Sequence, residues 1–315
     1  MAQRTAIAWD LPTLLRDVPG RKAFQHPLAP YTSFRIGGPA DALVRVESET
    51  ALRHVQAIAT AQQIPLFLMG GGTNLLIRDG GVRGIVVMLQ GAFRTYRLEP
   101  AAAAPSTTAQ VHVGVGVSFS RLALQMARQG WSGLEFAYGI PGTLGGAMVM
   151  NAGTYLGDLS QVLRVARMLD RNGQVQELPV ETLGLRYRGS SYPAGAILLA
   201  ATLHLQRGEG PVIEATMHTS YKQRQRTQPL TLPNAGSMFK NPPGVAAGRL
   251  IDALGLKGTR IGGAEISPLH ANFIVNMARA TAADVEALMA YMQERVYAAY
   301  DIVLEPEVRL IGEKA

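Results

Sequence analysis

The sequence predicts an α+β protein with more than one domain, and three observations support this prediction. The chain has 315 residues, of which 47% are hydrophobic and 17% charged, so it is long and apolar enough for more than one core. Strand-like and helix-like hydrophobic patterns follow one another along its length. Gly114 and Gly116 follow a strand-like run but lack the third glycine of the dinucleotide-binding fingerprint, which disfavours a Rossmann fold.

The first ninety residues predict a βαβ unit between Ala42 and Leu89. Residues 1–30 contain several prolines and are expected to be irregular. A glycine turn at Gly70–Asn74 follows the second strand of the unit, an arrangement suited to a diphosphate. The other elements are a helix from Ser48 or Thr50 to about Gln63, a strand over Pro65–Met69 and a strand over Ile85–Leu89.

Strand patterns dominate the middle of the chain. Residues 93–110 are expected to form a hairpin or a loop. Alternating residues predict a strand at Val111–Val117, and Ser118 is expected to cap a helix that Gly130 ends. Further short strands are expected over Arg164–Asp170, Gln174–Leu178 and Ile197–Gln206.

The segment GEGP at residues 208–211 is expected to separate a C-terminal α+β part from the rest. In this part, Thr281 and Asp284 form a capping box at the start of a long amphipathic helix. The other expected elements are a helix from about Pro211 to Arg224, a helix over Ala246–Leu254, a strand over Phe273–Asn276 and a closing strand over Ile302–Ile311.

The stretch from Gly139 to Gly157 holds six glycines and no charged side chain. Glycine lets the main chain come close to a ligand, so the stretch is consistent with a cradle of backbone N–H groups that binds phosphate without a cationic side chain. A pair of tight turns between strands explains the composition equally well, and both interpretations stay open.

Composition excludes several kinds of site. The 30 Lys and Arg exceed the 23 Asp and Glu, which gives a net charge of +7 and suits an anionic small molecule or a nucleic acid. The basic residues form no long block, which disfavours nucleic acid. The absence of cysteine excludes disulfides, thiolate metal sites and a cysteine nucleophile. The histidines show no paired ligand spacing, so no metal is expected. The start of the chain has no signal-peptide pattern and no stretch reaches the length of a membrane span, which predicts a cytoplasmic protein.

Five separated segments resemble one known family. They are GGGTNLLI (70–77), IPGTLGGAMVMNAGTYLG (140–157), YRGS (187–190), NAGSMFKNP (234–242) and LEPEVRLIG (304–312). Together they are similar to the UDP-N-acetylenolpyruvoylglucosamine reductases, flavoenzymes of peptidoglycan precursor synthesis, over roughly residues 25 to 312. Only 35 residues separate Arg188 from Arg224, so the chain resembles the type that lacks an extra loop whose tyrosine closes over the substrate.

The resemblance implies a fold and a reaction. It implies an N-terminal extension (1–24), an FAD-binding domain of the vanillyl-alcohol-oxidase type (25–208, with α+β subdomains at about 25–90 and 91–208) and a C-terminal α+β substrate domain (209–315). It implies that NADPH reduces noncovalent FAD, which then reduces UDP-N-acetylglucosamine enolpyruvate to UDP-N-acetylmuramate, in support of cell-wall biogenesis, cell shape and cell division. The expected partner is a UDP-sugar, with neither nucleic acid nor membrane, and the protein is expected to be a monomer.

Three residues match the catalytic positions of the family. Ser237 matches the proton donor, although a turn serine is the plain alternative. Arg188 matches the arginine that stabilises the developing enolate, since a guanidinium stays charged and grips a carboxylate with two donors. Glu307 matches the catalytic carboxylate, and Glu305 would lie on the same face of a strand as a supporting residue. We expect Glu307 and Arg188 to act as a coupled pair.

The resemblance also assigns the binding positions. For FAD these are Arg35, Gly70, Gly71, Gly72, Thr73, Asn74, Gly142, Thr143, Gly146, Asn151 and Gly153. For the substrate they are Tyr187, Lys222, Arg224, Arg226, Lys240 and Asn241, although a solvated basic helix end explains each cation equally well.

Two other functions remain as alternatives. A flavin oxidase on the same fold would lack the serine motif and the LEPEVR tail. A nucleotide or RNA binder would use the positive charge without catalysis.

Overall fold

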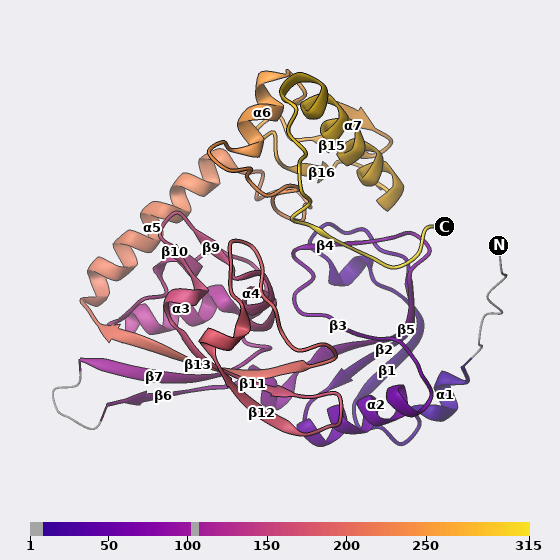
Figure 1. The fold of residues 1–315 in the computed structure, drawn as a ribbon, viewed down its shortest axis with the longest axis vertical. Coiled ribbons are helices and arrows are strands. Elements are labelled where there is room, and N and C mark those ends of the chain that lie inside the picture. The colour runs from indigo at the N-terminus through magenta and orange to yellow at the C-terminus, as the bar shows by residue number, and fades with distance from the viewer. Residues whose placement is uncertain (1–8, 102–106) are drawn as a thin grey trace.

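The computed structural model describes residues 9–101 and 107–315 (Figure 1). Strands and helices are mixed in three successive parts of the chain, which confirms the predicted α+β fold. We call these parts the first, middle and C-terminal units. Each unit has a sheet of its own and supplies most of one cluster of buried apolar side chains, although neighbouring units contribute to these clusters.

The first unit contains, in chain order, α1 (Leu11–Leu14), β1 (Arg21–Pro27), β2 (Pro39–Val46), α2 (Glu49–Ala61), β3 (Leu66–Leu68), β4 (Leu75–Ile77) and β5 (Val82–Leu89). Its sheet has the strand order β1-β2-β5-β3. β2 and β3 both run parallel to β5, and α2 connects them, so the predicted βαβ unit is confirmed. Ser48 is the N-cap of α2. Leu52 and Val55 of α2 pack against the sheet in the core of the first unit. This arrangement places the Gly70–Asn74 turn between β3 and β4.

The N-terminal segment is more regular than the sequence predicts. β1 pairs antiparallel with β2 along its length, and it crosses the expected boundary at residue 24. Pro12 lies in the first turn of α1 and Pro27 ends β1, where neither position needs a backbone N–H. Prolines therefore gave a misleading signal of irregular structure here. Three apolar side chains of this segment are buried in the core of the first unit: Leu11, Leu15 and Val18.

The middle unit contains β6 (Tyr96–Pro100), β7 (Thr108–Gly114), α3 (Phe119–Arg128), β8 (Trp131–Ser132), α4 (Leu144–Met150), β9 (Gly153–Thr154), β10 (Gly157–Asp158), β11 (Leu163–Leu169), β12 (Val175–Pro179), β13 (Ile197–Arg207) and α5 (Gly210–Thr227). Its antiparallel sheet has the order β12-β11-β13-β7-β6. β6 and β7 form the expected hairpin, whose residues 102–106 lie outside the described part of the chain. The expected strand at 111–117 ends at Gly114, where the backbone turns towards α3.

The glycine-rich stretch from Gly139 to Gly157 forms α4 and the short β9–β10 hairpin, with loops before and between them. α5 lies along the middle unit and leads into the C-terminal unit (Figure 1). Ile213 and Met217 of α5 are buried in the middle core together with side chains of α3 and α4. By its packing, the first half of α5 therefore belongs with the middle unit, and the predicted domain boundary at residue 208 stays a prediction.

The C-terminal unit contains α6 (Ala247–Ala253), β14 (Arg260–Ile261), β15 (Ala264–Ile266), β16 (Ile274–Asn276), α7 (Ala282–Tyr300) and β17 (Arg309–Ile311). The predicted capping box of α7 is present, since Thr281 Oγ1 accepts from Asp284 N at 3.1 Å and Asp284 Oδ2 accepts from Thr281 N at 3.0 Å. Phe34 and Leu76 of the first unit are buried in the core of this unit. β17 runs parallel to β4 and so returns the chain to the first unit.

The closing strand expected over residues 302–311 is wrong in most of its length, because only Arg309–Ile311 forms a strand. Pro306 lacks a backbone N–H and forms only an isolated bridge with Phe239. The residues before Arg309 therefore run as an irregular segment beside the serine motif, and alternation along a strand does not decide where their side chains point.

Candidate active site

Arg188 lies in a tight turn that presents its side chain to the C-terminal unit. Arg186 and Gly189 exchange two backbone hydrogen bonds of 3.0 and 3.1 Å, which leaves Tyr187 and Arg188 as the central residues of the turn. Arg188 adopts φ +50°, a conformation that is uncommon for a residue with a side chain. Its Nη2 donates to Gly153 O at 2.8 Å, and its guanidinium carbon lies 5.1 Å from the centre of the Tyr187 ring. These contacts fix the direction of the guanidinium.

Glu307 is the ion-pair partner of Arg188. Arg188 Nε lies 3.1 Å from Glu307 Oε1, and both side chains are about four-fifths buried, with 21% and 18% exposed. Burial raises the pKa of the Glu307 carboxyl above its usual range, while the charges of Arg188 and Lys240 act in the opposite direction. The expected pairing of Arg188 and Glu307 is thus present, and the carboxyl is held where it keeps a proton to a higher pH than an exposed glutamate.

Ser237 lies on a segment that is hydrogen-bonded to the segment of Glu307. Glu307 N donates to Met238 O at 2.8 Å, so the backbone of the residue after the serine is hydrogen-bonded to the backbone of Glu307. Ser237 itself bridges Phe273 and is half-buried. The three expected catalytic residues come from three distant parts of the chain, and the structure brings their segments together.

Glu305 and Glu307 have different surroundings, contrary to the expectation that both lie on one face of a strand. Glu305 pairs with Lys240 Nζ, and its side chain is 69% exposed, against 18% for Glu307. The irregular backbone around Pro306 separates the two carboxylates. The structure therefore supports Glu307 as the buried carboxylate and gives Glu305 the role of a partner for Lys240.

Two glycine-rich segments face each other next to this cluster. A Cβ atom on Gly71 would lie 2.7 Å from Gly142 Cα, and one on Gly142 would lie 2.7 Å from Thr73 Oγ1, so a side chain at either position would force the segments apart. Thr73 Oγ1 donates to Pro141 O at 3.3 Å across the same contact. We call the two segments, Gly70–Asn74 and Gly139–Thr143, the glycine cradle.

The cradle has the properties of a diphosphate site. Within residues 9–101 and 107–315, no group accepts a hydrogen bond from the backbone N–H groups of Gly70–Asn74. Thr143 is the N-cap of α4, but the first turn of α4 uses its N–H groups within the protein, since Leu144 N donates to Val117 O and Gly145 N donates to Val115 O, both at 2.9 Å. The donors that the cradle offers are therefore those of Gly70–Asn74. Uncharged main-chain donors of this kind bind the diphosphate of a dinucleotide such as FAD. The residues present therefore fit the cofactor that the sequence predicts.

The remaining expected cofactor residues have mixed surroundings. Gly153 contributes its carbonyl to Arg188, and Gly146 N donates to Thr143 Oγ1 at 3.5 Å. Asn151 is 2% exposed and ends α4, and its amide bonds Arg186 O and Ser160 N. Asn151 thus supports the Arg188 turn, and its contact with the cofactor stays a prediction.

Arg35 is exposed in the loop between the short 3-10 helix η1 (Ala29–Tyr31) and β2, at φ +59°. The same loop connects the cradle to the serine motif, because Ser33 N donates to Gly72 O at 3.2 Å and Ser33 Oγ donates to Asn234 O at 2.6 Å. The sequence singled out this loop only for its arginine. Its structural role in joining the two motifs was missed.

The basic residues of α5 divide into exposed and buried groups. Lys222 and Arg226 are exposed. Arg224 is partly buried, its Nε donates to Gln228 Oε1 at 3.1 Å, and burial lowers the pKa of its guanidinium. Arg224 Nη1 is buried without a hydrogen-bond partner among the described residues, and it lies 3.3 Å from where a Cβ on Gly139 would be. Arg224 therefore faces the cradle, whereas Lys222 and Arg226 face solvent.

Asn241, a further expected substrate residue, has a partner within the protein. Its Oδ1 accepts from Ala247 N at 3.0 Å, so it supports the start of α6. Asn74 also has a role that its motif did not reveal, since its Nδ2 donates to Glu307 O at 3.0 Å and its carbonyl accepts from Arg309 N at 3.0 Å. The last residue of the glycine turn thus holds the segment of Glu307.

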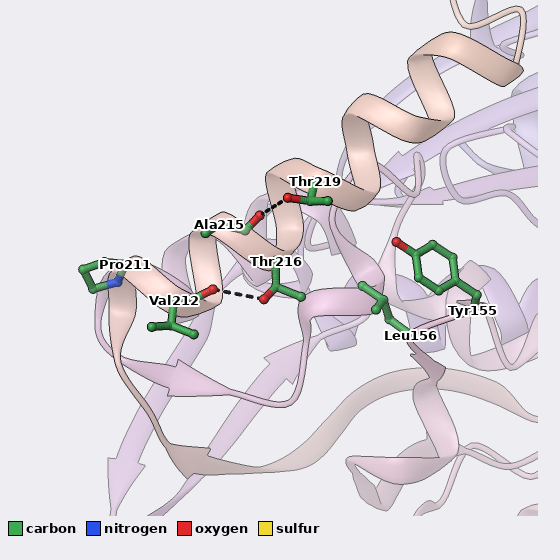
Figure 2. Close-up of a pocket in the computed structure, with 7 residues that line it drawn as sticks. All are labelled: Tyr155, Leu156, Pro211, Val212, Ala215, Thr216 and Thr219. Carbon is green, nitrogen blue, oxygen red and sulfur yellow. Dashed lines mark hydrogen bonds between the residues drawn. The ribbon is translucent and has the colours of Figure 1, made fainter.

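A separate groove lies between the first half of α5 and the turn of the β9–β10 hairpin (Figure 2). The hydroxyl groups of its two threonines are satisfied within α5, because Thr216 donates to Val212 O at 3.0 Å and Thr219 donates to Ala215 O at 2.8 Å. It holds no charged side chain and none of the three catalytic candidates. The groove is lined by Tyr155, Leu156, Pro211, Val212, Ala215, Thr216 and Thr219.

The described residues contain neither a metal-binding cluster nor a helix that could span a membrane. Among them, no group of three or more His, Cys, Asp or Glu side chains is arranged to hold a metal ion. Among the helices over residues 9–101 and 107–315, none combines the length and the apolar character needed to cross a bilayer.

The chain is similar to known proteins at the level of family, sequence and structure. A family model described as "FAD binding domain" matches residues 40–179, and one described as "UDP-N-acetylenolpyruvoylglucosamine reductase, C-terminal domain" matches residues 228–311. The UDP-N-acetylenolpyruvoylglucosamine reductase 2 of Symbiobacterium thermophilum is 41% identical over 303 residues, which are 96% of this chain and 96% of the relative. The reductase of Alkalilimnicola ehrlichii is 42% identical over 299 residues, 94% of this chain and 96% of the relative.

The structural comparison agrees with the sequence comparison. The crystal structure of UDP-N-acetylenolpyruvylglucosamine reductase from Thermus caldophilus superposes with a TM-score of 0.80 at 36% identity, over 93% of this chain and 99% of that chain. The similarity therefore covers all three units, including the segments that carry Arg188, Ser237 and Glu307.

Proposed function

The chain belongs to the UDP-N-acetylenolpyruvoylglucosamine reductase family, and we propose that it reduces UDP-N-acetylglucosamine enolpyruvate to UDP-N-acetylmuramate with NADPH as the hydride donor. The protein is an FAD-dependent oxidoreductase of peptidoglycan precursor synthesis. FAD, when bound, supplies the hydride transfer between NADPH and the substrate. The chain itself has to bind both ligands, orient them and move one proton.

One observation carries the proposal: the Arg188–Glu307 ion pair lies beside the Ser237 segment and is joined to the glycine cradle. The 3.1 Å pair joins the middle and C-terminal units, the 2.8 Å bond from Glu307 N to Met238 O joins it to the serine motif, and Asn74 connects it to the cradle at 3.0 Å. The cradle would hold the cofactor next to the carboxyl of Glu307, the guanidinium of Arg188 and the hydroxyl of Ser237.

Each of the three side chains has a task in the second half of the reaction. When the terminal carbon of the enolpyruvyl group accepts a hydride, negative charge develops at the neighbouring carbon and its carboxylate. The guanidinium of Arg188, fixed by Gly153 and Tyr187, stabilises that charge. The Ser237 Oγ–H then donates a proton to the carbon.

The protonation state of Glu307 decides whether its side chain repels or stabilises the developing enolate. A carboxylate beside a developing enolate opposes it, whereas a protonated carboxyl donates a hydrogen bond to it. Burial raises the pKa of Glu307, and the pairing with Arg188 stabilises the Glu307 carboxylate when its proton passes to the enolate oxygen. We assign to the pair the task of holding the enol form until Ser237 delivers its proton.

We call Arg188, Ser237 and Glu307 the catalytic cluster, and the UDP part of the substrate requires cations outside it. Lys222 and Arg226 lie exposed on the last turns of α5, just before the serine motif, and Lys240 follows the motif. We propose that this basic set binds the diphosphate and that Tyr187, which is 52% exposed, contacts the substrate. We further predict a cytoplasmic monomer that binds neither nucleic acid nor membrane.

The proposal is tested by separating the two half-reactions in the absence of oxygen. The purified protein is expected to carry a flavin absorbance band that bleaches on addition of NADPH and returns on addition of UDP-N-acetylglucosamine enolpyruvate. A band that returns only with oxygen indicates an oxidase and contradicts the proposal. A protein that never binds flavin supports the non-catalytic nucleotide binder instead.

A further inference from the structure

The segment that carries Ser237 is held from both sides. On one side, Ser237 bridges Phe273, and Met238 N donates to Asn272 O at 2.8 Å. On the other side, Glu307 N donates to Met238 O at 2.8 Å. The serine hydroxyl and the carboxyl of Glu307 thus lie on neighbouring segments, and their relative position depends on how firmly the serine segment is held.

Asn272 adds a second attachment through its side chain. Its Oδ1 accepts from Phe239 N at 3.0 Å, and its Nδ2 donates to Phe239 O at 2.8 Å. Asn272 is 3% exposed and Phe239 0%, so water has no access to replace either bond. An asparagine amide offers one donor and one acceptor side by side, which is the pair that the backbone of Phe239 needs.

Asn272 is held in turn by His270. Asn272 N donates to His270 Nδ1 at 3.2 Å, and the His270 and Phe273 rings lie with their centres 4.8 Å apart. Burial lowers the pKa of His270, which favours the neutral imidazole and leaves Nδ1 free to accept. His270, Asn272 and Phe273 therefore form one support for the main chain from Ser237 to Phe239.

We propose that Asn272 is a positioning residue, which holds the Ser237 hydroxyl in register with Glu307 and Arg188 through the main chain of Phe239. This inference rests on the proposed function, because Ser237 has a task only when the substrate takes up its proton. Loss of Asn272 is therefore expected to slow that step and to spare the reduction of FAD by NADPH.

The test uses the FAD-loaded Asn272→Ala variant, first reduced with NADPH and then mixed anaerobically with UDP-N-acetylglucosamine enolpyruvate. We expect flavin reoxidation to slow on the order of 100-fold, the cost of about 1 Å of misplacement. The rate of flavin reduction and the flavin spectrum are expected to stay as in the wild type. In a Ser237→Ala background, the same substitution is expected to cause no further loss.

Asn276→Ala is the matched control. Asn276 also bonds two backbone groups, with Nδ2 to Phe34 O at 3.1 Å and Oδ1 to Ala280 N at 3.0 Å, but neither belongs to the serine segment. It is expected to lower the melting temperature without slowing reoxidation. Equal slowing of both half-reactions in the two variants would show a general loss of structure and overturn the positioning role.

Asn272→Asp decides the question if the alanine variant does not fold. It keeps the shape of the side chain and the acceptor for Phe239 N, but it places a carboxylate oxygen against Phe239 O. Slow reoxidation with normal flavin reduction supports the proposal, and wild-type reoxidation overturns it. If the wild-type flavin itself is not reoxidised by the substrate, the proposed function fails first, and the role of Asn272 fails with it.

Discussion

The glycine cradle and the catalytic cluster lie next to each other but are built in opposite ways. The cradle consists of main chain, and its two segments meet because Gly71 and Gly142 have no side chains. The cluster consists of polar side chains, and Arg188 and Glu307 are partly buried against each other. The first part binds by shape and backbone donors, whereas the second works through charge and proton position.

This difference predicts that damage to each part affects a different measurement. A change in the cradle acts on the affinity for FAD, because the donors there belong to the fold and cannot be removed one at a time by mutation. A change in the cluster is expected to act on the second half-reaction, because we propose that its side chains contact the substrate.

Ser237→Ala is expected to have the largest effect. A positioned general acid contributes about 10² to 10⁴-fold to a rate, so reoxidation of reduced flavin by the enolpyruvyl substrate should fall by that factor. Reduction by NADPH should remain normal in the same stopped-flow experiment. A variant that loses both half-reactions together would remove the distinction between the cradle and the cluster.

Arg188→Lys should reduce the rate of reoxidation by about 10² to 10³-fold, the usual cost of losing one preorganised electrostatic donor. A lysine cannot bond Gly153 O and Glu307 together as the guanidinium does. Arg186→Lys is the control within the same turn, since Arg186 bonds Gly184 O and Ser191 Oγ instead. Similar rates for the two variants would contradict the assignment of Arg188.

Gly71→Ala should weaken FAD binding without a specific effect on the proton step. The new Cβ would lie 2.7 Å from Gly142 Cα, and overpacking of about 1–3 kcal/mol corresponds to about 5 to 150-fold in Kd. Fluorescence titration of the apoprotein with FAD measures the change. Gly255→Ala, at φ +67° with no atom within 4 Å of its Cβ, tests backbone strain far from the cradle and should leave the Kd unchanged.

Glu307→Gln should change how stability depends on pH. Burial raises the pKa of Glu307 in the folded state, so its contribution to stability is complete below the unfolded value of 4.5 and is lost as pH rises through the folded pKa. Glutamine does not ionise, so the Glu307→Gln variant does not lose this stability as the pH rises. Its melting temperature should therefore rise relative to that of the wild type over this pH window, and a constant difference would contradict the raised pKa.

Local patterns predicted those elements that depend on neighbouring residues. Ser48 at the start of α2 and the Thr281 capping box act over three residues, so the sequence alone locates both helices. Proline signals were less reliable. Pro12 and Pro27 occupy positions where α1 and β1 tolerate them, whereas Pro306 lies in an irregular segment where its neighbours favoured a strand.

The catalytic cluster depends on contacts that no local pattern contains. Asn74 and Glu307 are hydrogen-bonded across 233 positions, and Ser33 and Asn234 across 201. Family motifs supplied the identities of Arg188, Ser237 and Glu307, but not their pairing partners. Asn272 was missed because an asparagine just before a strand-like run gives no sign of the main-chain groups to which its amide is hydrogen-bonded.

The most direct test of the account is a crystal structure of the FAD-loaded protein with the enolpyruvyl sugar nucleotide bound. The account predicts that the FAD diphosphate contacts the backbone of Gly70–Asn74 and that the substrate carboxylate contacts Arg188. It also predicts that Ser237 Oγ lies within hydrogen-bonding distance of the carbon to be protonated or of a water that bridges to it. A substrate carboxylate far from both Arg188 and Ser237 would contradict it.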